Sequence, residues 1–106
     1  MNIKARIVRM VDNENSNIKA IANVNIGGAF AVHGIRVMDS KNGIFVQMPQ
    51  SSYQKDGKTE YREIVHPITA EARTELNDAV LSAYEERLAE LQDMDEDELP
   101  DFEQIM

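Results

Sequence analysis

Five residues suited to binding a polyanion lie within ten positions in the middle of the chain. They are two tyrosines and three cations: Tyr53, Lys55, Lys58, Tyr61 and Arg62. Cations neutralise phosphates and release counterions, and tyrosines stack on bases or hydrogen-bond to phosphate. Asp56, Glu60 and Glu63 lie among them, so the local charge is close to balanced. The residues alone favour an ordinary solvated loop, with a nucleic-acid site as the alternative.

A further cation, Arg73, falls in the first turn of a helix that the sequence predicts. Unpaired backbone N–H groups at a helix N-terminus favour anions and disfavour a cation, by about 0.3–1 kcal/mol. A bound phosphate would offset that cost, and so would a carboxylate such as Glu71 or Asp78. Both interpretations stay open from the residues alone.

The residue types favour no catalytic chemistry. The chain has no cysteine and two histidines, His33 and His66, for which structural hydrogen bonding is the expected role. It contains no Gly-rich phosphate loop, no Gly-x-Ser-x-Gly and no His-Glu-x-x-His. Without cysteine or a spaced carboxylate triad, no metal site is predicted. We therefore expect a protein that is not an enzyme and has no cofactor, metal or small-molecule substrate.

Alternating apolar and polar residues predict the strands that position these side chains. Residues 2–12 and 18–26 both have period two, with Arg9 interrupting the apolar face of the first, and a turn-forming segment separates them. Together they predict a β-hairpin. Residues 29–38 predict a third strand whose phase slips by one residue. A bulge at residues 33–34, where glycine is present, would restore the register.

The next segments predict a second hairpin, a polar loop and a short strand. Residues 39–43 form a turn ending in Asn-Gly, and residues 44–48 are the fourth strand. Residues 50–60 are polar and contain Asp-Gly, and we expect a loop there. A short fifth strand covers about residues 61–65, before a proline that lacks an N–H donor.

The C-terminal third predicts one amphipathic helix. Thr69 is a good N-cap, and apolar residues then recur at steps of three or four over about 20 residues. The fold class is therefore α+β, with a small antiparallel β-sheet of about five strands, this helix packed on one face, and an acidic tail. We expect one domain over residues 1–91 and a disordered tail over residues 92–106.

Acidic and basic residues are unevenly distributed along the chain. The total is −8, but residues 1–84 carry ten basic and nine acidic residues, whereas residues 85–106 carry one and ten. The body is thus nearly neutral, and its overall acidity does not argue against nucleic acid. The acidic end either solvates the protein or competes with phosphate for the basic segment. No apolar run approaches the length needed to span a bilayer, and we expect a cytoplasmic protein.

Several residue types in fixed order resemble the SpoVG (stage V sporulation protein G) family. The resemblance runs from about Met1 to Tyr84 and is strongest from Ala29 to Val80. Its most specific pieces are Ala29-Phe30 with His33, Ile35-Arg36-Val37, Gly43-Ile44-Phe45-Val46 with Met48-Pro49, Asp56-Gly57, Arg62 with Ile64 and His66-Pro67-Ile68, and Arg73 with Glu75 and Leu76. The chain departs from the family at Gln50-Ser51-Ser52, where a basic pair is usual, and at Gly34, where an acidic residue is usual.

The resemblance implies a homodimeric, non-catalytic regulator that binds DNA, with RNA as a further candidate. It implies a link to sporulation and asymmetric septation, and no membrane association. By position, it implies nucleic-acid contacts at Arg62 and Arg73, and also at Lys55 and Lys58. Arg36 matches the family too, although a strand arginine can be structural. The alternative is a protein-interaction module of the cell-division machinery that acts without binding nucleic acid.

Overall fold

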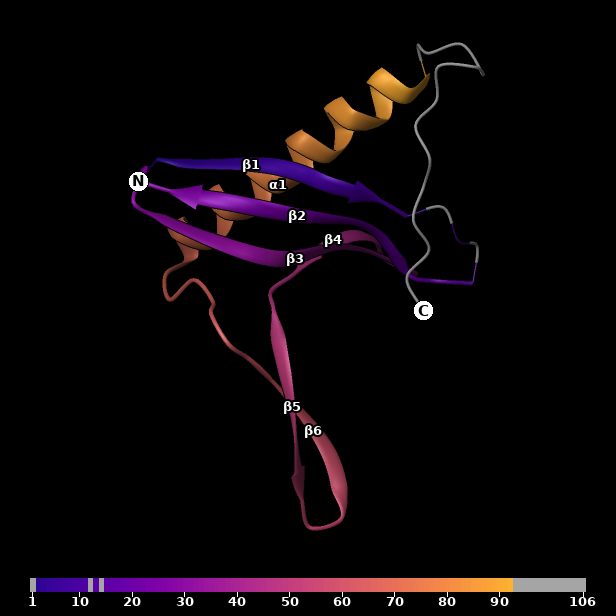
Figure 1. The fold of residues 1–106 in the computed structure, drawn as a ribbon, viewed down its shortest axis with the longest axis vertical. Helices are drawn as coiled ribbons and strands as arrows, with labels where there is room; N and C mark the ends of the chain where they lie inside the picture. The colour runs from indigo at the N-terminus through magenta and orange to yellow at the C-terminus, as the bar shows by residue number, and fades with distance from the viewer. Residues whose placement is uncertain (1, 12, 14, 93–106) are drawn as a thin grey trace.

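The chain forms two antiparallel sheets and one helix, as the computed structural model shows for residues 2–11, 13 and 15–92 (Figure 1). The strands are β1 (Ile3–Met10), β2 (Ile18–Ile26), β3 (Phe30–Ser40), β4 (Gly43–Gln47), β5 (Gln50–Lys55) and β6 (Lys58–Glu63), and the helix is α1 (Ala70–Gln92). Strands β1 to β4 pair in sequence order, and β5 pairs with β6. The predicted α+β class is confirmed, with six strands in two sheets.

Helix α1 covers one face of the four-stranded sheet, behind it in Figure 1. The core lies between them. Its buried residues come from β2, β3, the position just after β4, and α1: Ala20, Ala22, Val24, Ile35, Val37, Met48, Leu76, Val80 and Tyr84. On α1 the buried positions Leu76, Val80 and Tyr84 are four apart, which places them on one face of the helix. Tyr84 is a core residue that the apolar pattern did not include.

Two β-bulges explain the irregularities in the sequence pattern. In β3, the span from Val32 to Ile35 lies opposite the shorter span from Ala22 to Val24, so β3 carries one extra residue. This confirms the bulge predicted at residues 33–34, where Gly34 has a φ of +78°. In β1, a second bulge between residues 7 and 9 puts Arg9 opposite Ile21, on the face away from α1.

The segment 50–60 is not the loop that the sequence predicted. Residues Gln50–Lys55 and Lys58–Glu63 pair as the hairpin β5–β6, joined by Asp56 and Gly57. The predicted strand over 61–65 is also wrong in extent, since β6 begins at Lys58 and ends at Glu63. The cause is that every β5 residue is exposed, so no apolar alternation marks the strand.

Helix α1 starts as the sequence predicted. The N–H of Ala72 donates to the Thr69 Oγ1 at 3.1 Å, which makes Thr69 the N-cap. The helix continues to Gln92, and the remainder of the predicted tail, residues 93–106, lies outside the described residues. No helix within the described part of the chain combines the length and the apolarity needed to cross a bilayer.

Candidate nucleic-acid interface

The hairpin β5–β6, called the arm below, is held by its turn and its own ladder. Asp56 and Gly57 have φ values of 52° and 78°, the left-handed pair that a two-residue type I′ turn requires. At the other end, the N–H of Ile64 donates to the Pro49 carbonyl at 2.9 Å. Within the described structure, β5 and β6 contact each other and no other helix or strand. The arm points away from the four-stranded sheet (Figure 1). The arm is therefore a surface with solvent on both faces.

The register of the arm places its three cations on one face. Lys55 lies directly opposite Lys58, and Arg62 lies opposite Ser51. Alternate residues of a strand share a face, so Lys55, Lys58 and Arg62 lie on the same side with Tyr53 and Glu60. We call this side the cationic face. The other side carries Gln50, Ser52, Gln54, Thr59, Tyr61 and Glu63.

Contacts on the cationic face organise Tyr53, Glu60 and Arg62. The Tyr53 hydroxyl donates to Glu60 Oε2 at 2.8 Å, and the Arg62 guanidinium lies 5.5 Å from the centroid of the Tyr53 ring. This distance is within the range of a cation–π contact. Among the described residues, no carboxylate lies within ion-pair distance of Lys55, Lys58 or Arg62. Three cations thus remain available to phosphate, and a tyrosine supports one of them.

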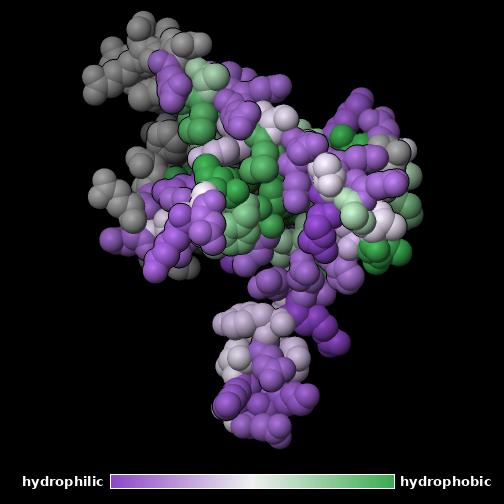
Figure 2. Space-filling view, turned by 180° about the vertical axis from the view of Figure 1, so that it is seen from behind, coloured by the Kyte–Doolittle hydropathy of each residue, from purple (hydrophilic) through white to green (hydrophobic). Residues whose placement is uncertain are grey.

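The arm shows little apolar surface to solvent. Figure 2 shows it, below the body, as hydrophilic or near neutral in hydropathy, whereas apolar residues gather on the body. A two-stranded hairpin with no apolar face is marginally stable by itself. Cross-strand contacts such as Tyr53 with Glu60 and Gln54 with Thr59 support this one, at about 0.2–1 kcal/mol each.

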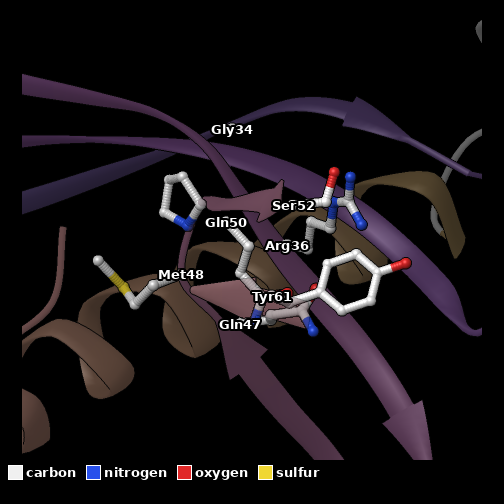
Figure 3. Close-up of a pocket in the computed structure, with 8 residues that line it drawn as sticks. Gly34, Arg36, Gln47, Met48, Gln50, Ser52 and Tyr61 are labelled. Atoms are coloured by element: carbon white, nitrogen blue, oxygen red, sulfur yellow. The ribbon is translucent and has the colours of Figure 1, made fainter. Parts of the chain in front are cut away.

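A polar cleft lies where the arm meets the four-stranded sheet (Figure 3). It has a volume of about 230 Å³ and is lined by Gly34, Arg36, Gln47, Met48, Pro49, Gln50, Ser52 and Tyr61. Arg36 comes from β3, Gln47 from β4 and Tyr61 from β6, and β5 supplies the remaining polar side chains, so four strands contribute to the lining. Met48 is buried in the core and closes the apolar side of the cleft.

The structure brings together some of the predicted site residues and separates others. Lys55, Lys58 and Arg62 share the cationic face, and Arg36 lies at the base of the arm. Arg73 is exposed in the first turn of α1, where its N–H donates to the Thr69 carbonyl at 3.1 Å. Because α1 contacts β1 to β4 and neither strand of the arm, Arg73 belongs to a separate part of the surface in one protomer.

The sequence interpretation missed Gln47 and Gln50 as cleft residues. Both flank Met48-Pro49, which was interpreted as the end of a strand and as part of the family resemblance. The signal that could have found the arm is Asp56-Gly57 between two short runs, since a two-residue loop of this type marks a hairpin. Within residues 2–11, 13 and 15–92, no group of three histidine, aspartate or glutamate residues could hold a metal ion.

Comparisons with known proteins agree on one family. A family model described as SpoVG matches residues 1–86. A protein of Heliobacterium modesticaldum is 44% identical over 82 residues, which span 77% of this chain and 88% of the relative. A protein of Bacillus cytotoxicus is 43% identical over 86 residues, spanning 81% and 84%. One of Macrococcus caseolyticus is 45% identical over 71 residues, spanning 67% and 59%. All three carry the name septation protein SpoVG.

Proposed function

The chain belongs to the SpoVG family, and from that premise we propose that it is a non-catalytic, cytoplasmic nucleic-acid-binding regulator whose contacts with phosphate come from the cationic face of the arm. The observation that carries the proposal is the shared face of Lys55, Lys58 and Arg62, with no carboxylate paired to any of them in the described structure. Because the contacts are with phosphate, binding is mostly electrostatic and depends little on the nucleotide sequence.

The biological setting follows from the relatives. They are named as septation proteins, and the proposal places this chain in the same process, linked to sporulation and asymmetric septation. A protein that binds DNA or RNA through phosphates acts there by controlling gene expression. The proposal assigns the chain no reaction and no small-molecule substrate.

We propose that the active form is a homodimer, for a reason of affinity. One arm offers about three phosphate contacts, which is too few for useful binding at physiological salt. Two arms offer about six, and the logarithm of the binding constant then falls with the logarithm of salt concentration with a slope of about −4 to −6. In such a dimer, Arg73 of either copy can join the phosphate contacts at the N-terminus of α1.

The test is the salt dependence of binding to labelled duplex DNA and RNA, measured by fluorescence anisotropy. In the double variant Lys55→Gln/Lys58→Gln, we expect the slope to become shallower by about 3 to 4 for a dimer. The matched control is Lys41→Gln, which removes an exposed cation from the turn between β3 and β4, away from the arm. Binding by the control should equal that of the unmodified protein. An unchanged slope in the double variant would remove the arm from the interface.

The second candidate function is that of a protein-interaction module of the division machinery. It is favoured by β4, an edge strand of the four-stranded sheet with Ile44 and Phe45 at 45% and 43% exposure. An exposed edge of this kind can accept a strand from a partner. Absence of salt-sensitive binding to either nucleic acid would favour this function over the first.

A further inference from the structure

The cleft at the base of the arm has a chemistry distinct from that of the cationic face. Ser52 and Tyr61 pair directly across the arm, on the side opposite Lys55, Lys58 and Arg62. The phosphate-binding residues of the proposed function therefore do not line the cleft. Its polar residues are instead two glutamines, a serine and one arginine, beside an aromatic ring.

The ring of Tyr61 is the first element of a recognition site. Tyr61 is 69% exposed, although it is one of the largest side chains on the arm. An exposed aromatic ring beside a cation is the usual platform for stacking a base of a single strand. In Figure 3 the ring lies on the same side of the cleft as the Arg36 guanidinium.

Amide side chains supply the second element. Gln47 and Gln50 each offer donors and an acceptor, the groups that pair with the edge of a nucleobase. Arg36 is exposed and can reach the phosphate next to a bound base. The cleft, at about 230 Å³, has several times the roughly 30 Å³ that one water occupies in the liquid. It therefore has room for a planar ring.

Each wall of the cleft is held by backbone pairing of its own. Strands β3 and β4 pair directly, with Arg36 opposite Gln47. The hydrogen bond from the Ile64 N–H to the Pro49 carbonyl closes the base of the arm at 2.9 Å. Because the backbone of each wall is already ordered, less conformational entropy is lost there when a ligand binds.

We propose that this cleft binds one unpaired nucleobase of a single-stranded nucleic acid, with Tyr61 stacking on its face, Gln47 and Gln50 pairing with its edge, and Arg36 contacting the adjacent phosphate. The inference rests on the proposed function, because the cationic face supplies the general affinity for the strand. It adds a preference for unpaired over paired nucleic acid, since a base inside a duplex presents neither its face nor its pairing edge.

The experiment compares three probes of equal length, about 12 nucleotides: a DNA single strand, the same strand in a duplex, and an abasic single strand. In the variant Tyr61→Leu, affinity for the single strand should fall by about 5- to 100-fold, because stacking is lost. Affinity for the duplex and the abasic strand should not change. Tyr61→Phe keeps the ring and should bind all three probes as the unmodified protein does.

Lys58→Gln is the matched control, because it lies on the cationic face and should weaken binding to all three probes alike. An equal change on all probes in Tyr61→Leu, or no change on any, would overturn the base site while leaving the proposed function in place. Failure of the unmodified protein to bind any probe would instead overturn the proposed function, and the base site with it. Urea unfolding confirms that each variant is folded.

Discussion

Tyr84 makes the stability of the folded protein depend on pH. Its ring is buried with Leu76 and Val80 between α1 and the sheet. Burial raises the pKa of the Tyr84 phenol above its ordinary value of 10.0, and the nearby carboxylate of Asp39 raises it further. The folded protein thus favours the neutral phenol. The resulting stability is complete below the pKa of the unfolded chain and is lost as the pH rises through the folded pKa.

We expect Tyr84→Phe to reduce the loss of stability at alkaline pH. Phenylalanine fills the same space and carries no ionisable group, so that variant has no buried phenolate to form. Urea unfolding at about pH 7 and about pH 11, followed by circular dichroism, measures the effect. Tyr61→Phe serves as the control, because it removes the same hydroxyl from an exposed position. If Tyr84→Phe and Tyr61→Phe lose the same stability between the two pH values, Tyr84 does not contribute to the pH dependence.

Among the elements, the arm is the one that the body does not stabilise through packing. Neither β5 nor β6 contacts α1 or the four-stranded sheet in the described structure. Its two ends are joined by the hydrogen bond between Ile64 and Pro49. That bond joins a carbonyl and an N–H group in the same way as the hydrogen bond that closes a β-turn. A short linker can therefore replace the arm.

Replacement of residues 50–63 by Asn-Gly should leave the body folded and remove nucleic-acid binding. The change in unfolding free energy should be about 1 kcal/mol or less, because neither strand of the arm packs against an element of the body. Urea unfolding measures the first effect and anisotropy with labelled DNA the second. Loss of the cooperative transition would show that the body depends on the arm, and retained binding would place the phosphate contacts elsewhere.

Over the whole molecule, acidic residues are concentrated toward the C-terminal end of the chain. Figure 1 shows α1 ending on the side away from the arm, and its last three turns contain Glu85, Glu86 and Glu90. Residues 93–106 follow, with seven acidic residues and no basic one. The family match ends at residue 86, so most of this acidity lies beyond it. The acidic end therefore adds repulsion to phosphate that the family domain does not require.

Truncation after Gln92 should raise the affinity for DNA at low salt. The seven acidic residues repel phosphate or compete with it for the cationic face. This effect should shrink as salt rises, because the screening length falls to about 10 Å at 0.1 M. Anisotropy titrations over a salt series compare the truncated chain with the full chain. Full-length protein with the seven residues changed to asparagine or glutamine is the control for chain length. Unchanged affinity and slope would contradict the idea.

Local sequence patterns were sufficient to predict the four-stranded sheet and the start of α1. Alternation predicted β1 to β4, and the phase slip at residues 33–34 predicted the β3 bulge, because a buried face permits only one register. Thr69 marked the start of α1 through its capping chemistry. These features depend on neighbours within a few residues, and they appear in the order of residue types.

The arm and the cleft could not be predicted in this way, because they depend on how distant segments of the chain are arranged in the tertiary structure. The arm carries no apolar face, so its pairing left no periodic signal, and the shared face of Lys55, Lys58 and Arg62 emerged only from its register. The cleft required Arg36 and Tyr61, which are 25 positions apart, to meet at the base of the arm. Their meeting depends on the direction in which the arm leaves the sheet after Pro49. That direction belongs to the tertiary structure, and no local pattern in the sequence records it.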